Sequence, residues 1–169
     1  MLKTDAIDLG AKIGVVAHDA GGAEVVSSFL WKTKAKFKAL LGGPAVKIFK
    51  TKVGGVRVPS FDDLINNIDI LITGTSYPEN LEWQAMRIAK EKNIEVVSFL
   101  DSYINFRIRF IRENQLLIPN KVFASDDYSF NIAKKDLPEF NVIKINNYHK
   151  EFVISSSNKI NPSSPQSEK

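Results

Sequence analysis

The sequence contains no cysteine among its 169 residues. This absence excludes a disulfide framework and thiolate metal sites, and it is compatible with a reducing compartment. Only 2 histidines are present, which leaves no spacing typical of a metal site. No apolar run approaches the ~20 residues of a membrane-spanning helix. Residues 1–9 mix Lys3, Asp5 and Asp8 with apolar side chains and do not resemble a secretory signal. We therefore expect a cytoplasmic protein with no metal and no cofactor.

The composition is that of an ordinary globular protein, with 44% apolar and 25% charged residues. A chain of 169 residues fits one domain and buries enough surface to need no covalent staples. The formal net charge of +4 is mild, so the positions of the charges are more informative than their total. We expect no nucleic-acid partner, because the basic residues are not interleaved with the exposed aromatic residues of a single-strand binder.

Short apolar runs alternate with helix-like segments along the chain. The runs at residues 13–17, 69–73 and 96–100 are typical of strands buried on both faces. Further strands are expected at residues 36–41, 46–49, 56–58, 121–124 and 142–145, and helices at 23–31, 60–67, 76–93 and 126–135. This alternation predicts a single Rossmann-like α/β domain, in which a parallel sheet of about five to seven strands has helices on both faces.

Two helix starts have the spacing of a capping box, in which a Ser side chain pairs with an acidic residue three positions later. The pairs are Ser60 with Asp63 and Ser76 with Glu79, the second with Pro78 inside the first predicted turn.

Two segments break the alternation. Residues 106–117 alternate charged and apolar side chains, which indicates an extended segment with one charged side. The composition then changes to Ser, Asn, Pro and Lys near the end of the chain. We therefore expect the folded domain over residues 1–153 and a disordered tail over residues 154–169, because such a tail has too few apolar side chains to anchor it.

Polar residues follow each predicted strand. In open parallel sheets, ligands bind beyond the carboxyl ends of the strands, near the point where the strand order switches. The predicted catalytic residues are His18, Asp19 and Asp101, and the predicted ligand-binding residues are Gly21, Gly22, Gly74, Thr75, Ser76, Ser102 and Asn105. Further polar groups at the same edge are Ser125, Asp126, Asp127, Asn146, Asn147, Tyr148 and His149.

The H-D-A-G-G run at residues 18–22 is the most informative of these clusters. Its glycines allow a backbone to pass close to a ligand, and the helix that begins after them favours an anion at its N-terminus. His18 suits a general base or a hydrogen-bond donor. The alternative is a tight turn with a half-buried histidine. The run matches neither the G-x-G-x-x-G dinucleotide fingerprint nor a P-loop.

The other rim residues also have structural alternatives. Asp101 suits a proton acceptor or a partner for a sugar hydroxyl, but it also suits a turn cap. Ser76 is either a ligand contact or a helix N-cap. We expect Asp126 and Asp127 to serve the following helix through its dipole, and His149 to be solvated.

Four lysines alternate with other residues at positions 32, 34, 36 and 38, and they share one face if the stretch is extended. One interpretation is an edge strand that its charges protect from pairing. The other is a patch for a phosphate-bearing acceptor or an anionic membrane surface, so any membrane contact is at most peripheral.

Several motifs together resemble a known family. They are H-D-A-G-G-A-E-V-V-S-S, then T-G-T-S with Glu82 in the next helix, then V-V-S-F-L-D-S-Y-I-N-F-R-I-R-F, then L-I-P-N-K-V-F-A-S-D. From about residue 12 to 149 the chain resembles the N-terminal Rossmann-like half of GT-B-type glycosyltransferases and of UDP-N-acetylglucosamine 2-epimerase-like proteins of polysaccharide biosynthesis. In such proteins this half holds the acceptor, and a second half holds the nucleotide sugar.

The resemblance implies a glycosyltransferase-like acceptor-side domain, with the predicted site residues at the cleft between the two halves and the segment 103–110 near them. The sequence ends where that second half is expected, so we expect a separate donor-binding subunit and a sugar or sugar-phosphate ligand. Two alternatives stay open. One is a non-catalytic sugar- or nucleotide-binding regulatory module, and the other is a small stand-alone enzyme acting on a phosphorylated metabolite. A homo-oligomer is also possible.

Overall fold

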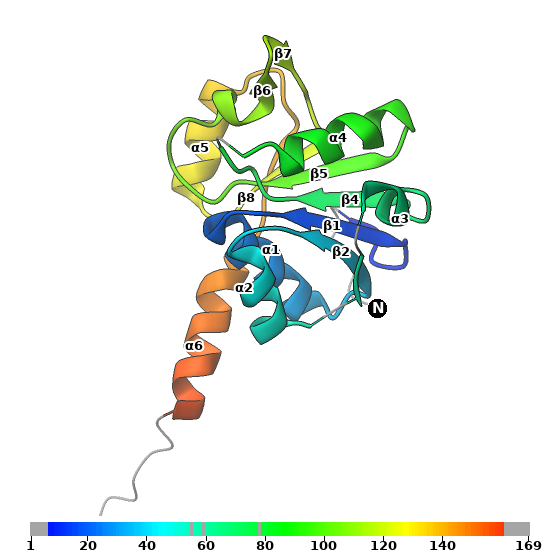
Figure 1. Ribbon diagram of the computed structural model, residues 1–169. Helices are drawn as coiled ribbons and strands as arrows, with labels where there is room; N and C mark the ends of the chain where they lie inside the picture. The colour runs from blue at the N-terminus through cyan, green and yellow to red at the C-terminus, as the bar shows by residue number, and fades with distance from the viewer. Residues whose placement is uncertain (1–6, 55, 59, 78, 161–169) are drawn as a thin grey trace, which may run out of the picture.

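The computed structural model describes residues 7–54, 56–58, 60–77 and 79–160 and shows a parallel sheet between helical layers (Figure 1). Its strand order is β3-β2-β1-β4-β5-β8-β9, and each neighbouring pair is parallel. The strands are β1 (Ile13–Ala17), β2 (Phe37–Leu41), β3 (Val56–Arg57), β4 (Ile70–Thr73), β5 (Glu95–Phe99), β8 (Lys121–Ala124) and β9 (Val142–Lys144). The predicted Rossmann-like α/β class is confirmed.

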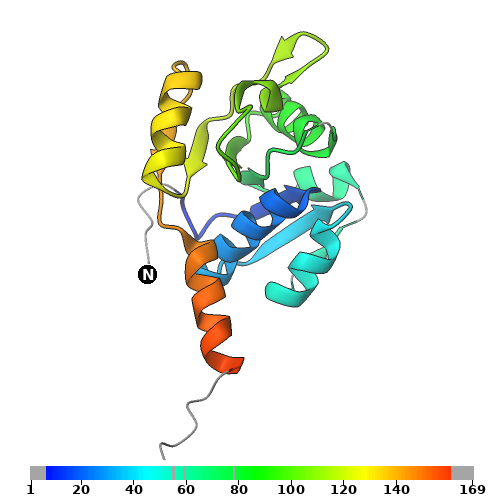
Figure 2. The same ribbon diagram turned by 90° about the vertical axis from the view of Figure 1, so that its left-hand side faces the viewer.

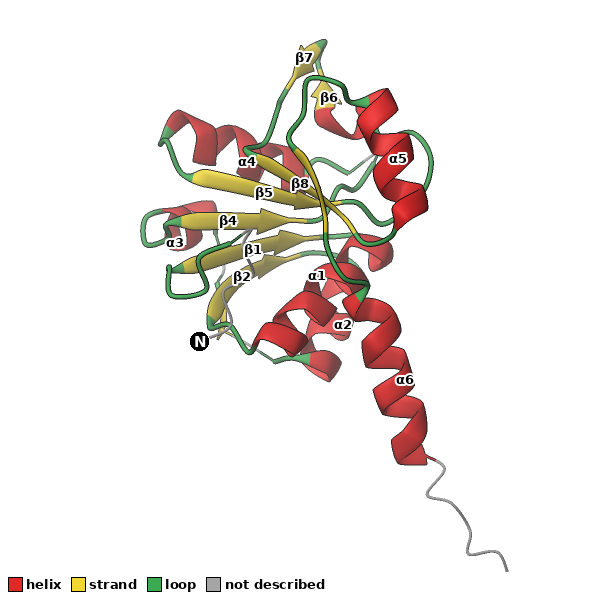
Figure 3. Cartoon of the chain, turned by 180° about the vertical axis from the view of Figure 1, so that it is seen from behind, coloured by secondary structure: helices red, strands yellow, loops and turns green. Residues whose placement is uncertain are grey.

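The strand order reverses at β1. The chain runs outward from β1 through β2 to β3, then returns to the other side of β1 with β4 and continues to β9. Figure 3 shows strands β2, β1, β4 and β5 pointing the same way, so their carboxyl ends meet at one edge. The switch point of this doubly wound sheet therefore lies between the carboxyl ends of β1 and β4.

The helices cover both faces of the sheet, and each face has its own core. They are α1 (Ala20–Thr33), α2 (Ala45–Lys52), α3 (Phe61–Ile65), α4 (Leu81–Glu91), α5 (Asp127–Asp136) and α6 (Tyr148–Ile160). Val15 and Ile72 pack with α1 and α2, whereas Val16 and Leu71 pack with α3 and α4. Successive side chains of a strand point to opposite faces, which is why the predicted strands are continuously apolar. No helix in the described part of the chain is long and apolar enough to cross a membrane.

The segment predicted as a strand at residues 46–49 is helical and belongs to α2. Ala45 and Phe49 are the buried residues of this helix, and Lys47 and Lys50 are exposed. Buried residues four positions apart share one face of a helix. The spacing of the apolar residues within 46–49 did not reveal the helix, because Ala45, which shares the buried helix face with Phe49, precedes the predicted strand.

Residues 106–117 are not an extended segment. They form a 3₁₀ turn, Arg107–Phe110, followed by a short hairpin of β6 (Ile111–Arg112) and β7 (Gln115–Leu116). Phe106 and Phe110 are both buried, and the indole N–H of Trp83 donates to the Phe110 carbonyl at 3.2 Å. The buried side chains of Phe106 and Phe110 thus hold this segment against the core in a bent conformation.

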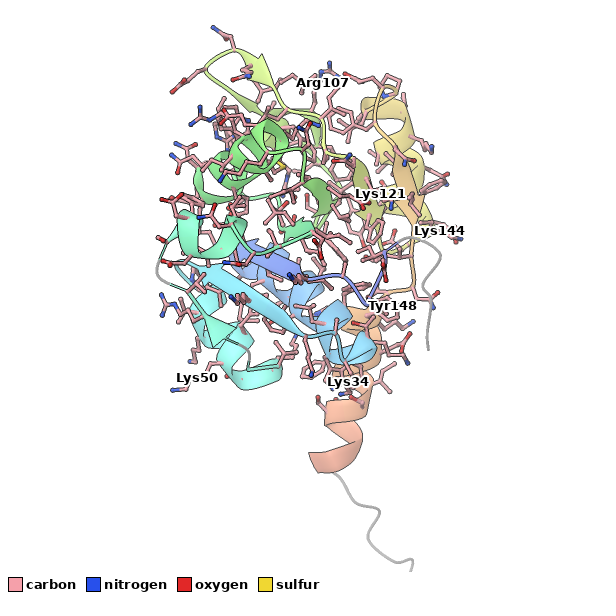
Figure 4. The ribbon with its side chains drawn as sticks, turned by 90° about the vertical axis from the view of Figure 1, so that its right-hand side faces the viewer. Lys34, Lys50, Arg107, Lys121, Lys144 and Tyr148 are labelled. Carbon is pink, nitrogen blue, oxygen red and sulfur yellow. The ribbon has the colours of Figure 1, made fainter. Side chains whose placement is uncertain are left out.

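The four lysines at positions 32–38 do not form a single charged strand face. Lys32 lies in the last turn of α1, Lys34 follows it with a left-handed φ of 56°, and Lys38 lies in β2. Strand β2 pairs with both β1 and β3, so it is not an edge strand. In Figure 4, Lys34 and Lys50 point outward near the ends of two different helices.

Helix α6 continues past the predicted domain boundary. The prediction of disorder from residue 154 is wrong for residues 154–160, which are helical, and residues 161–169 lie outside the described residues. The first turns of α6 pack on α1, with Trp31 and Phe152 rings 5.3 Å apart and a 2.6 Å Lys32–Glu151 ion pair. Figure 2 shows the rest of α6 extending away from the sheet. The anchored turns supply a nucleus from which the polar serine-rich sequence continues as helix.

We predict that only the first turns of α6 stabilise the domain. A chain ending at Ile154 keeps Tyr148, Glu151 and Phe152, so its melting temperature should stay within about 2 °C of the full chain. A chain ending at Asn147 loses these contacts with α1 and should melt several degrees lower, since each kcal/mol corresponds to roughly 2–4 °C at this size. Scanning calorimetry of both chains measures the difference, and equal melting temperatures would contradict the assigned packing.

Candidate functional site

The predicted site residues gather at the carboxyl-end edge of β1, β4 and β5. His18, Asp19, Gly21 and Gly22 follow β1, then Gly74, Thr75 and Ser76 follow β4, and Asp101 and Ser102 follow β5. Asn105 follows the same strand but is exposed, with a left-handed φ of 58°. Its backbone conformation marks it as a turn residue, since Asn adopts this region more readily than most residues.

The two glycines nearest the switch point lie against each other. A Cβ added to Gly22 would lie 3.0 Å from the Gly74 Cα, and one added to Gly74 would lie 3.2 Å from the Gly22 Cα. These glycines therefore let the first turn of α1 pack against the loop after β4. The sequence suggested that the glycines make room for a ligand, whereas here the neighbouring loop fills the space beside Gly22.

The N-terminus of α1 already has a carboxylate beside it. A Cβ added to Gly21 would lie only 2.1 Å from Asp101 Oδ2, so the Asp101 side chain fills that space. Helix N-termini favour negative charge, and Asp101 supplies it from within the chain. A carboxylate of the protein thus lies next to the H-D-A-G-G run, where the sequence predicted a bound anion.

Arg109 holds Asp101 in this position. Its Nη1 donates to Asp101 Oδ1 at 2.6 Å and to the Thr75 carbonyl at 2.8 Å, and its Nη2 donates to Ser102 Oγ at 2.8 Å. Both side chains of the Asp101–Arg109 pair are largely buried. Burial raises the pKa of the Asp101 carboxyl, and the charge of Arg109 opposes that rise.

A second arginine supports the loop after β4. Arg112 Nε donates to Asn80 Oδ1 at 2.7 Å, and its Nη2 donates to the Ser76 and Glu79 carbonyls at 3.1 and 2.8 Å. The resemblance implied that the segment 103–110, which contains Arg109, lies near the site, but neither arginine was among the predicted site residues. The available signal was the position of both arginines in the segment that follows β5 and Asp101.

Glu82 is a buried carboxyl group at the centre of the rim. Its Oε1 accepts the His18 backbone N–H at 2.8 Å, and its Oε2 accepts the Ser76 hydroxyl. Ser76 therefore does not cap α4. A cap at Ser76 implies a helix that begins at Tyr77, whereas α4 begins four residues later, at Leu81. Burial raises the pKa of Glu82, and the hydrogen bonds from Ser76 and His18 oppose the rise. Pro78, expected inside the helix, lies outside the described residues.

His18 is partly exposed and has a fixed partner. Its Nδ1 lies 3.0 Å from Asp19 Oδ1, and its ring packs against Gly42 and Gly43. A Cβ on Gly43 would lie 2.7 Å from the imidazole Cε1. The hydrogen bond to Asp19 raises the pKa of His18 and outweighs its partial burial. This shift favours the protonated form of His18, a hydrogen-bond donor, over the neutral form that a general base requires.

An open hollow lies on the other side of Asp101, between the ends of β5, β8 and β9. It has a volume of about 130 Å³. Its polar lining includes Asp101, Ser102, Tyr103, Asp126, Asn147 and His149.

Asp126 also caps α5, as predicted, because its Oδ1 accepts the Ser129 N–H at 2.7 Å. Asp127, by contrast, pairs with Lys144 at the surface.

The described residues include no group of three or more His, Asp or Glu side chains arranged to hold a metal ion. No family model and no curated protein matches the chain. The similarity to GT-B-type glycosyltransferases therefore stays a prediction from the motifs.

We predict opposite effects for two substitutions of Glu82. Burial raises the pKa of Glu82, so protonation of this carboxyl stabilises the folded state. That stabilisation is fully present below the pKa of Glu82 in the unfolded state, and it is lost as the pH rises through the pKa in the folded state. Glu82→Gln has no charge to bury, so it should gain stability relative to the unaltered protein as the pH rises from about 4, near the ordinary pKa of a glutamic acid, towards alkaline values. Urea denaturation across this pH range measures the difference.

Glu82→Ala is the matched comparison. It leaves the His18 N–H and the Ser76 hydroxyl without their acceptor, which should cost about 1–3 kcal/mol. If the stability of Glu82→Gln relative to the unaltered protein fell as the pH rose, the assigned direction of the pKa shift would be wrong.

A double-mutant cycle tests the contact between Gly21 and Asp101. Gly21→Ala must displace the Asp101 carboxylate and should destabilise the fold by about 1–3 kcal/mol. Asp101→Ala should also destabilise it, because it leaves Arg109 unpaired. In the double variant the clash is gone, so the loss should be smaller than the sum by about 1 kcal/mol or more. Additive losses would show that the two residues do not touch.

Proposed function

We propose that this domain is the acceptor side of a glycosyl-transfer enzyme in polysaccharide or glycoconjugate biosynthesis. It binds a sugar at the carboxyl-end rim, and a further domain or a separate chain supplies the donor-binding half. The observation that carries the proposal is the chemistry of the rim, where carboxylates, hydroxyls and an amide border open space beyond β5 and β8. This chemistry agrees with the motif resemblance to the N-terminal halves of GT-B-type enzymes.

The charges at the rim favour a sugar hydroxyl over a phosphate. Asp101 and Asp126 both line the hollow, and no described Lys or Arg side chain does. Arg109 and Arg112, the nearby cations, are engaged with Asp101, Ser102 and backbone carbonyls. Carboxylates accept hydrogen bonds from hydroxyls but repel phosphate oxygens. The rim thus has the polarity of an acceptor subsite rather than that of a nucleotide diphosphate site.

The proposed roles follow from position. Asp101 is the predicted catalytic residue whose side chain borders the hollow, so it is the group that meets an acceptor hydroxyl. His18, held by Asp19, is a proton donor on the switch-point side of the rim. We also propose a cytoplasmic location, because nucleotide-activated sugars, the donors in such reactions, are cytoplasmic metabolites.

A non-catalytic sugar-binding module is the second candidate. It is favoured by the ion pair between Asp101 and Arg109, because Arg109 already occupies Oδ1 of the carboxylate that would have to accept the proton of an acceptor hydroxyl. In this case the rim recognises the sugar without transferring it.

Protein-observed NMR with three probes tests the proposal. N-acetylglucosamine should shift amide signals beyond β5 and β8, glucose 6-phosphate should bind more weakly, and UDP-N-acetylglucosamine should not be hydrolysed by this chain alone. Stronger binding of the sugar phosphate would favour an enzyme acting on a phosphorylated metabolite. Release of UDP by the isolated chain would show that no donor-binding partner is needed.

A further inference from the structure

The hollow beyond β5 and β8 has the size of one small ring. An apolar cavity of ~150 Å³ is known to hold a benzene molecule. The volume here is about 130 Å³, and the hollow is open to solvent on one side. A pyranose is larger than benzene, so one sugar ring can place an edge in this open hollow, while the rest of that ring and further rings of a longer ligand would lie outside.

The hollow combines hydrogen-bonding groups with a negative charge balance. Asp126 Oδ1 is used by the helix cap, but its Oδ2 lies at the hollow, where the Tyr103 hydroxyl donates to it at 3.2 Å. Asn147 adds an amide, and Ser125 adds a hydroxyl. This mixture of donors and acceptors matches the hydroxyl groups of a neutral sugar, and the carboxylates disfavour a phosphorylated one.

Two exposed tyrosines stand at the side of the hollow. Tyr103 lines it and is 50% exposed, and Tyr128, 65% exposed, packs against Tyr103 with ring centroids 5.2 Å apart. The charge of Asp126 raises the pKa of the Tyr103 hydroxyl, so that hydroxyl stays protonated as a donor. The exposed half of the Tyr103 side chain therefore lies beside the polar lining of the hollow.

We propose that this hollow is a subsite for one neutral sugar ring, with Tyr103 as the stacking wall and Tyr128 as its support. The face of an aromatic ring is negative and attracts the polarised C–H groups on the apolar face of a pyranose. Asp126, Asn147 and Asp101 then meet the hydroxyls at the ring edge. The inference rests on the proposed function, because both place a sugar at this rim. It adds that the hollow binds a single sugar ring, that this sugar is uncharged, and that Tyr103 stacks on it.

Substitutions of Tyr103 test the stacking wall, with N-acetylglucosamine and glucose as probes and binding followed by NMR titration. Tyr103→Ala should weaken binding by about tenfold, the loss of one aromatic stacking contact. Tyr103→Phe keeps the ring and should stay within about twofold of the unaltered protein. Tyr77→Ala is the matched control, because Tyr77 is 53% exposed but does not line the hollow, and it should leave binding unchanged.

The outcomes separate this inference from the proposed function. Sugar binding that shifts amide signals beyond β5 and β8 but is insensitive to Tyr103→Ala overturns the subsite and leaves the acceptor-side proposal standing. Binding that depends on Tyr103, together with release of UDP by this chain alone, supports the subsite and overturns the need for a donor-binding partner. The absence of any shift with neutral sugars overturns both.

Discussion

The guanidinium of Arg109 holds the carboxyl-end rim together. It joins Thr75, which follows β4, to Asp101 and Ser102, which follow β5. Because Asp101 fills the space beside Gly21, the same arginine influences how closely α1 approaches the end of β5. A planar group with several fixed donors suits this task, whereas the single ammonium of a lysine does not reach so many acceptors in one geometry. The hollow thus depends on Arg109, although Arg109 does not line it.

The rim has a closed part and an open part. At the switch point between β1 and β4, the contact of Gly22 with Gly74 and the buried Glu82 leave the loops packed together. Asp101 forms the boundary, and the hollow lies beyond it. Ligands of doubly wound sheets bind near the switch point. In this chain the hollow lies instead towards the ends of β5, β8 and β9.

The sequence predicted the sheet well because the strands are buried on both faces. Continuous apolar runs, such as residues 13–17 and 96–100, are local patterns that predict strands directly. Prediction failed where distant contacts decided the conformation. Residues 46–49 are helical because Ala45 and Phe49 together face the core, and α6 continues past residue 154 because its first turns pack on α1. The edge at which His18 and Asp101 gather was predictable, since strand ends in a parallel sheet share one side.

The sequence by itself determined the Rossmann-like sheet and the edge at which the polar residues meet. It also determined the start of α3, where the Ser60 hydroxyl accepts the Asp63 N–H as the capping spacing predicts. These depend on side-chain periodicity and on caps that involve neighbours in the chain. Only the tertiary structure decided the roles of the rim residues. The carboxyl of Glu82 meets a backbone N–H 64 positions away, and Arg109 bonds to a carbonyl 34 positions away. Burial and pairing set the charge and hydrogen-bonding capacity of these groups, and both arise only when distant segments pack together.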